Sequence, residues 1–163
     1  MKSFSKLPPQ FRCDEVKEYY NILSHKNGSL ILKRAFDIVV SFILLILLII
    51  PIIIIAFAVK LTSEGPVFYR QERVTTYGKI FKILKFRTMV QNADKIGTLV
   101  TTDSDSRVTN IGRFLRKYRL DELPQVFNVL SGSMSIVGTR PEVPKYVNEY
   151  KPEYYATLLI PAG

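Results

Sequence analysis

The sequence is poor in the residues on which many catalytic and structural sites depend. Its 163 residues include one cysteine, one histidine and no tryptophan. With a single cysteine, no disulfide can form within the chain. Cys13 and His25 both precede the long apolar segment, which disfavours a Cys/His zinc site and a Ser-His or Cys-His catalytic pair. If the protein is an enzyme, we expect carboxylates and basic side chains, with or without a hard metal ion, to carry the chemistry.

The chain also has little negative charge. It contains 23 lysines and arginines against 14 aspartates and glutamates, which gives a formal net charge of +9 at pH 7. Basic proteins associate with nucleic acid, anionic lipid or phosphorylated substrates. Because the sequence has no recognisable nucleic-acid-binding motif and contains a long apolar segment, we expect membrane lipid and phosphate-bearing substrates as partners, and no nucleic acid.

The apolar segment covers residues 38–59 and contains no formal charge. At about 1.5 Å of rise per residue, it is long enough to cross a bilayer as a helix. Pro51 lies within it, where it removes a helix hydrogen bond. Lys33, Arg34 and Lys60 place positive charge at both ends, so the charges select no orientation. The residues favour a kinked transmembrane helix, and they also permit a helix–break–helix hairpin whose two ends share one side of the membrane.

The segments on either side of this run are polar. Residues 1–29 are expected to form a leader with at most one short helix, at residues 14–23. After the apolar run, two β-rich stretches within residues 64–89 flank a turn at residues 76–78. This pattern predicts a β-hairpin.

A loop and a helix are predicted next. Residues 90–108 form the loop, in which Asp103 and Asp105 act as turn formers or caps. Thr109 or Asn110 caps the helix that follows. Four apolar residues recur in it at helical spacing and predict a buried stripe: Ile111, Phe114, Leu115 and Tyr118.

Two adjacent carboxylates, Asp121 and Glu122, lie between a basic run and Pro124, which fits the first position of a second helix. Most adjacent acidic residues are simply solvated, and a helix start stabilises negative charge without any function. The catalytic alternative is that one carboxylate binds Mg²⁺ together with substrate phosphates while the other attacks phosphorus. The spacing permits both interpretations.

Four arginines have the same two interpretations, surface residue or phosphate ligand. They are Arg87, Arg116, Arg119 and Arg140. Arginine is the natural bidentate ligand for phosphate, and Arg140 lies in a loop stiffened by prolines. Each of the four, taken alone, is more often a surface residue.

Together these segments resemble the bacterial sugar transferases, monotopic phosphoglycosyl transferases that act on polyprenyl phosphate. The matching motifs occur in the family's order over residues 30–163: "KRAFDIVVS", "GPVFYRQERV", "GKIFKILKFRTM", "IGRFLRKYRLDELPQVFNVLSGSMSIVGTRPE" and "IPAG". The resemblance implies an α+β protein in which residues 30–62 form a re-entrant membrane helix, broken at Pro51. It implies that residues 63–163 form a small, mainly helical cytosolic phosphoglycosyl transferase domain with a β-hairpin.

The resemblance also implies an activity and a site. The reaction is transfer of a phospho-sugar from a UDP-sugar to a polyprenyl phosphate such as undecaprenyl phosphate, with release of UMP, and it begins exopolysaccharide, lipopolysaccharide or other glycan assembly. Asp121 is the nucleophile that forms a covalent intermediate, and Glu122 is its partner in holding Mg²⁺. Arg87 and Arg140 contact substrate phosphates. The enzyme lies at the bacterial inner membrane, with its catalytic domain on the cytoplasmic face.

The chain departs from the family pattern in three places. Ile50 stands where serine often precedes the central proline, and Thr139 stands where proline is common. The sequence "LLIPAG" stops where the family continues through an "RPGITG"-like segment. We therefore expect an incomplete catalytic domain. The alternative function is that of an inactive membrane-anchored remnant that binds lipid phosphate or a partner protein.

Overall fold

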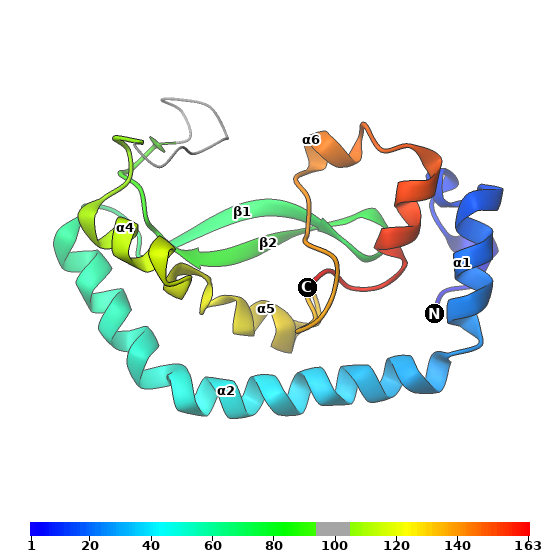
Figure 1. Cartoon of the computed structure of the whole chain (residues 1–163), viewed down its shortest axis with the longest axis horizontal. Coiled ribbons are helices and arrows are strands. Elements are labelled where there is room, and N and C mark those ends of the chain that lie inside the picture. Colours follow the sequence, from blue (N-terminus) through cyan, green and yellow to red (C-terminus); the bar gives the residue numbers. More distant parts are fainter. Residues whose placement is uncertain (94–104) are drawn as a thin grey trace. The chain divides into compact units, whose positions relative to one another are not determined.

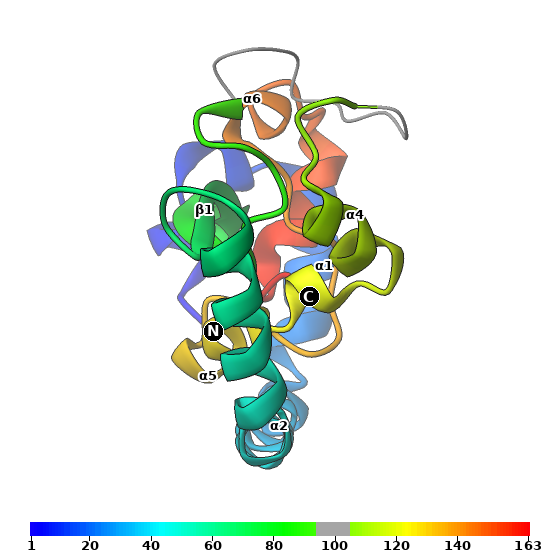
Figure 2. The same ribbon diagram turned by 90° about the vertical axis from the view of Figure 1, so that its left-hand side faces the viewer.

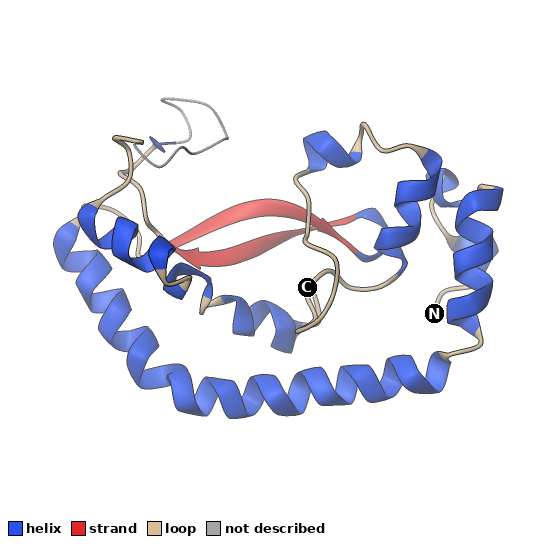
Figure 3. Ribbon diagram, viewed as in Figure 1, coloured by secondary structure: helices blue, strands red, loops and turns tan. Residues whose placement is uncertain are grey.

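The computed structural model of the chain describes residues 1–93 and 105–163 (Figure 1). Its main elements follow in the order α1 (Asp14–Ser24), α2 (Asn27–Thr62), β1 (Phe68–Thr75), β2 (Lys79–Phe86), α4 (Asn110–Lys117), α5 (Gln125–Ser131) and α6 (Pro144–Val147). Helices dominate, and the two strands pair in one sheet (Figure 3). The expected α+β class is therefore confirmed.

The chain divides into two compact units. Unit 1 contains Met1–Ile43, Gln71–Ile83 and Phe127–Gly163, and unit 2 contains Leu44–Arg70 and Leu84–Val126. Both α2 and the hairpin contribute residues to each unit, so the units do not coincide with the three segments expected from the sequence. Those segment boundaries stay a prediction.

Helix α2 is a continuous helix of 36 residues with Pro51 inside it. Among the described residues it is the one helix that is long and apolar enough to cross a membrane, judged by length and composition. Most of its large apolar side chains are exposed to the surroundings. The expected break at Pro51 is not confirmed. A proline costs a helix one hydrogen bond, and a long helix that is otherwise fully paired can continue through that loss.

The core of unit 1 includes the leader. Leu7, Phe11 and Val16 are almost completely buried. They pack with apolar side chains from β1 and from the C-terminal segment, namely Val74, Val147, Leu158 and Leu159. The predicted leader helix is α1, and it packs beside the 3₁₀ segment η5 (Pro152–Leu159) in two perpendicular views (Figures 1 and 2). The leader therefore contributes three apolar side chains to the core of unit 1, although most of its residues are polar.

The first half of α2 is fastened to unit 1 by polar contacts. Arg34 donates through Nη1 to the carbonyl oxygen of Val129 at 2.6 Å and through Nη2 to that of Leu130 at 2.8 Å, near the end of α5. Asp37 is buried and accepts hydrogen bonds from the Ser135 hydroxyl at 2.8 Å and from a backbone N–H at 3.1 Å. A cation at a helix C-terminus and a fully bonded buried carboxylate are both stabilising.

The core of unit 2 forms between the second half of α2, the hairpin and α4. Ile52 and Val59 of α2 pack with Phe86 and Leu115. The predicted hairpin is confirmed, with its turn at Thr76–Gly78. Strand β2 therefore runs from unit 1 into unit 2 and ends beside the residues of the candidate site.

Candidate active site

Helix α4 and the turn that follows it position the two adjacent carboxylates. Thr109 is the N-cap, and its hydroxyl accepts a hydrogen bond from the N–H of Gly112 at 3.0 Å, as predicted. A Cβ at Gly112 would lie 2.0 Å from the carbonyl oxygen of Thr88, so only glycine lets α4 approach this strand end so closely. Arg119 has a left-handed conformation with a φ of 58° and turns the chain sharply after α4. The next three residues form the 3₁₀ turn η4 (Leu120–Glu122).

Asp121 lies in this turn with its side chain buried. Burial raises the pKa of the Asp121 carboxyl group above its ordinary value. The positive charge of Lys85 opposes the rise, and the neighbouring Glu122 adds to it. A buried carboxylate that is not neutralised by an ion pair of its own is costly for folding, and perturbed carboxyl groups of this kind cluster at functional sites.

Glu122 lies beside Asp121 and forms an ion pair with Lys85. The Lys85 Nζ and the Glu122 Oε1 are 2.7 Å apart, and both side chains are partly exposed. Lys85 comes from β2, the strand that carries the sequence "KIFKILKF". Nothing in the sequence pattern distinguished Lys85 from the other lysines of this strand. Lys85 is identified only in the folded structure, by its ion pair with Glu122 from a distant segment of the chain.

The predicted phosphate-binding arginines fall into different environments. Arg116 is half-buried, donates through Nε to the Thr88 hydroxyl at 2.8 Å and contributes positive charge near Asp121. Arg119 is exposed. Arg140 belongs to unit 1, where it is exposed on a loop held to β1 by hydrogen bonds to Pro141 and Glu142. The structure therefore groups Arg116 with the carboxylates in unit 2 and presents Arg140 on the other unit.

Arg87 is the most buried of the four, with 6% of its surface exposed. Its Nη2 donates to the carbonyl oxygen and to the hydroxyl of Ser63, both at 2.7 Å. Burial lowers the pKa of the Arg87 guanidinium. Its Nε and Nη1 have no hydrogen-bond partner in the part of the chain that the structure describes.

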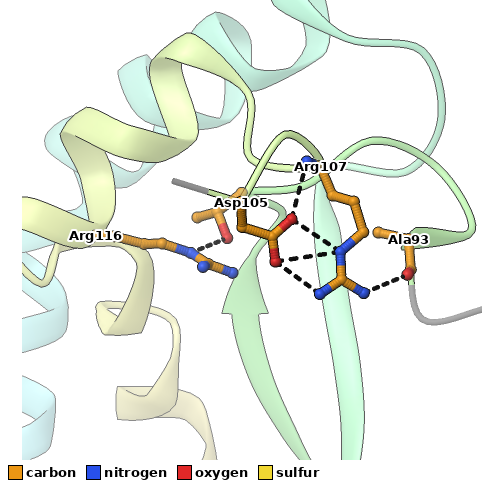
Figure 4. A network of polar contacts seen from close by, with 5 residues as sticks. Ala93, Asp105, Arg107 and Arg116 are labelled. Atoms are coloured by element: carbon orange, nitrogen blue, oxygen red, sulfur yellow. Dashed lines mark hydrogen bonds and ion pairs between the residues drawn. The ribbon is translucent and has the colours of Figure 1, made fainter. Parts of the chain in front are cut away.

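Arg107 joins Asp105 to the backbone of Ala93 through a network of polar contacts (Figure 4). Asp105 accepts a hydrogen bond from the backbone N–H of Arg107 at 3.0 Å, which confirms it as a turn former. The Arg107 guanidinium also pairs with Asp105 at 2.6 Å and donates to the carbonyl oxygen of Ala93 at 2.9 Å. Hydrogen bonds from Arg107 lower the pKa of Asp105 to about 2. The second expected turn former, Asp103, lies outside the described residues.

The Asp105–Arg107 pair predicts an acid-dependent loss of stability. Because the folded-state pKa is depressed, the pair stabilises the protein fully above the ordinary aspartate pKa of about 3.9, and this stabilisation is lost as the pH falls to about 2. Thermal unfolding of the wild type and of Asp105→Asn, followed by circular dichroism, should differ at pH 7 and converge between pH 4 and pH 2. A difference that does not change over this range would contradict the assignment.

The two adjacent carboxylates have the donor type that Mg²⁺ takes. Within residues 1–93 and 105–163 there is no group of three or more His, Cys, Asp or Glu side chains that could hold a metal ion. Proteins commonly bind Mg²⁺ through one or two carboxylates and leave the other positions to water and substrate phosphates. Asp121 and Glu122 fit a shared site of this kind and do not form a closed protein site.

Comparison with known proteins places these residues in a family. The family model described as bacterial sugar transferase matches residues 28–163. The chain belongs to the bacterial sugar transferase family. Both carboxylates and all four candidate arginines of this sugar transferase lie within the matched residues, whereas most of the leader precedes them.

Curated relatives of the sugar transferase carry related names. The UDP-glucose:undecaprenyl-phosphate glucose-1-phosphate transferase of Klebsiella pneumoniae is 48% identical over 77% of this chain and 27% of the relative. The undecaprenyl-phosphate galactose phosphotransferase of Salmonella typhimurium is 42% identical over 77% of this chain and 29% of the relative. A Bacillus subtilis protein with the provisional name undecaprenyl-phosphate N-acetylgalactosaminyl 1-phosphate transferase is 43% identical over 80% of this chain and 74% of the relative. The chain thus spans less than a third of the first two relatives.

Proposed function

We propose that the protein transfers a sugar phosphate from a UDP-sugar to undecaprenyl phosphate or a similar polyprenyl phosphate. The observation that carries this proposal is the buried Asp121 carboxyl group beside the Glu122–Lys85 ion pair and the Arg116 charge. All three relatives are named for undecaprenyl phosphate, while their names give different sugars: glucose, galactose and N-acetylgalactosamine. The names of these relatives therefore share the lipid acceptor and differ in the sugar.

The proposed reaction has two steps at one phosphorus atom. An oxygen of Asp121 attacks the phosphorus that carries the sugar, the diphosphate P–O bond breaks, and UMP leaves with that bond's electron pair. An oxygen of the polyprenyl phosphate then attacks the same phosphorus and displaces Asp121 as a carboxylate. Covalent catalysis of this kind lets one site serve two acceptors in turn.

The charged neighbours of Asp121 have separate roles in this proposal. Lys85 holds Glu122 in place and favours the ionised form of Asp121, which is the form that attacks. Arg116 and the exposed Arg119 contribute positive charge that attracts the diphosphate. Asp121 and Glu122 would hold Mg²⁺, which neutralises negative charge on the diphosphate when bound.

We also infer that α2 enters and leaves the membrane on the same, cytoplasmic face of the bacterial inner membrane. Its first half is fastened to unit 1 through Arg34 and Asp37, and its second half packs in unit 2 through Ile52 and Val59. Basic residues lie at both ends of the apolar run, as expected if both ends stay on the cytoplasmic side, and this supports a re-entrant course.

Labelling from one side of the membrane tests this topology. In a Cys13→Ser background, Ser5→Cys and Glu64→Cys each introduce one exposed thiol, before and after α2. In sealed membrane vesicles, a membrane-impermeant thiol reagent should label both variants from the same side. Labelling from opposite sides would establish a spanning helix and reject the re-entrant course.

Release of UMP tests the activity. Membranes that contain the protein are incubated with undecaprenyl phosphate, Mg²⁺ and a panel of UDP-sugars. We expect UMP with at least one sugar, none from Asp121→Asn, and an unchanged rate from the exposed control Asp14→Asn. No UMP from the wild type with any sugar would instead favour the membrane-anchored remnant.

A further inference from the structure

Arg87 has hydrogen-bonding capacity that its own unit does not use. Only 6% of the Arg87 surface is exposed, and two of its three guanidinium nitrogens, Nε and Nη1, are buried without a hydrogen-bond partner among the described residues. Of the ion pairs found there, which involve Asp37, Asp105 and Glu122, none includes Arg87. A buried cation without a counter-charge is destabilising unless something compensates it. Arg87 is therefore poised to accept an anion.

A purely structural role explains only some of the hydrogen-bonding groups of the Arg87 side chain. Ser63 directly follows the last residue of α2, so the bonds from Arg87 Nη2 to Ser63 cap the C-terminal end of that helix. A cation at this position is favourable because the helix C-terminus is negative. The cap uses one nitrogen, however, and leaves Nε and Nη1 unexplained.

The backbone around Arg87 is shaped to admit its guanidinium. Gly65 has a φ of 110°, a conformation that other residues rarely adopt. A Cβ at Gly65 would lie 2.5 Å from Arg87 Nη1 and 3.4 Å from the side-chain amide of Gln91. Glycine at this position thus leaves room for the guanidinium beside the segment that follows α2.

Arg87 follows Lys85 by two residues in an extended stretch of the chain. Its N–H donates to the carbonyl oxygen of Val67 at 2.9 Å, so the extended hairpin pairing continues one residue past β2. Residues two apart in an extended chain share a face and lie roughly 7 Å apart. Lys85, which holds Glu122, and Arg87, which holds Ser63, therefore occupy neighbouring positions on one face of unit 2.

The position of Arg87 along α2 indicates where its anion comes from. The apolar run ends at Val59, and Ser63 lies four residues later, beyond the end of the helix. If α2 lies in the membrane, this segment is at the depth of the lipid phosphates, where basic side chains meet negative charge. A phosphate carried by a lipid reaches this depth, whereas a nucleotide sugar approaches from water.

We propose that Arg87, with Ser63 and Gly65 around it, binds the phosphate group of the polyprenyl phosphate acceptor and not the diphosphate of the nucleotide sugar. This inference rests on the proposed function. It divides the site into a donor part at Asp121, Glu122 and Arg116 and an acceptor part at Arg87. The acceptor phosphate would then lie beside the phosphorus that it must attack in the second step.

Measuring the two half-reactions separately tests the division. The first is the single-turnover release of UMP from UDP-sugar without acceptor, and the second is transfer to polyprenyl phosphate at varied concentrations. We expect Arg87→Gln to keep the first rate within about twofold and to raise the KM for polyprenyl phosphate about 10- to 100-fold, as loss of a charged hydrogen bond does. Arg87→Lys should recover part of the affinity, and Arg113→Gln, an exposed arginine of α4, should change neither quantity.

Two results would overturn the proposal. A parallel fall in the UMP burst would assign Arg87 to the donor or to folding, and an unchanged KM would remove it from acceptor binding. Thermal unfolding of both Arg87→Gln and Ser63→Ala identifies a folding defect: Arg87→Gln loses the guanidinium that caps α2, whereas Ser63→Ala loses only the bond to the hydroxyl and keeps the bond to the carbonyl oxygen. Only loss of the guanidinium should affect the acceptor strongly.

A binding experiment separates this proposal from the proposed function. Wild type and Arg87→Gln are mixed with vesicles of neutral lipid alone, with added anionic phospholipid, or with added polyprenyl phosphate, and inorganic phosphate serves as competitor. A loss of binding in the variant that is confined to vesicles with polyprenyl phosphate supports the site even if no UMP is formed. An equal loss on anionic phospholipid would identify a general headgroup contact and overturn the acceptor assignment.

Discussion

Asp121→Asn is expected to abolish UMP release while making the protein more stable to heat at neutral pH. Removing the nucleophile should lower turnover by at least about 10³-fold, as loss of a residue that acts in a catalytic unit does. The gain in stability follows from the raised pKa. Because burial makes Asp121 harder to ionise in the folded state, the wild type loses stability as the pH rises from about 3.9 through the folded-state pKa.

The uncharged asparagine removes that cost, so the variant should unfold at a higher temperature at pH 7, by about 2–4 °C for each kcal/mol relieved. The measurement is thermal unfolding in a chelating buffer, which excludes bound metal, at pH 7 and at pH 4. The difference should shrink at pH 4, because a raised pKa leaves more of the wild-type carboxyl group protonated there than at pH 7. Glu122→Gln is the matched control, because it breaks the ion pair with Lys85 and should give no gain. A less stable Asp121→Asn would indicate a structural carboxylate and not a catalytic one.

Lys85→Gln is expected to slow the first half-reaction and to shift its dependence on pH. Without the lysine, Glu122 loses its 2.7 Å partner and the main charge that opposes the raised pKa of Asp121 disappears. The rate at pH 7 should fall about 10- to 100-fold, the range expected for a lost charge-assisted hydrogen bond. The acid limb of the pH–rate profile should move to higher pH, because Asp121 then ionises less readily.

The profile of UMP release from pH 5 to pH 9 measures both effects. Lys85→Arg keeps the charge and should restore the position of the acid limb. Lys82→Gln, an exposed lysine on the same strand, should leave the rate and the limb unchanged. If Lys82→Gln and Lys85→Gln behave alike, general positive charge, and not the ion pair with Glu122, supports the reaction.

Local sequence signals predicted the elements that carry the site. The turn between β1 and β2, the Thr109 cap and the short helix after Pro124 each depend on residues close together in the chain. Such signals act within a few residues and need no knowledge of tertiary packing. They placed Asp121 and Glu122 at a helix entrance, which the structure confirms as the 3₁₀ turn before α5.

Three features of the fold and the site depend on tertiary contacts and could not be predicted from local sequence: the buried face of α4, the role of Lys85 and the packing of the leader. In the predicted apolar stripe, Ile111 and Leu115 pack in unit 2, whereas Phe114 and Tyr118 are exposed and pack on each other with ring centroids 5.0 Å apart. Lys85 joins the site only because β2 ends beside η4, which no spacing in the sequence encodes. The leader likewise looked polar because its three buried residues are scattered among charged ones. Periodicity identifies a helix face, and only packing shows which part of that face is covered.

The most direct test of the central claim is the mass of the intact protein after incubation with a UDP-sugar and Mg²⁺ in the absence of polyprenyl phosphate. If Asp121 attacks the phosphorus that bears the sugar, the wild type should gain the mass of one phosphosugar, lose it when polyprenyl phosphate is added, and release UMP in equal amount. Asp121→Asn should gain nothing. Turnover by the wild type without any mass increase, or an adduct that persists in Asp121→Asn, would contradict the assignment of Asp121 as the nucleophile.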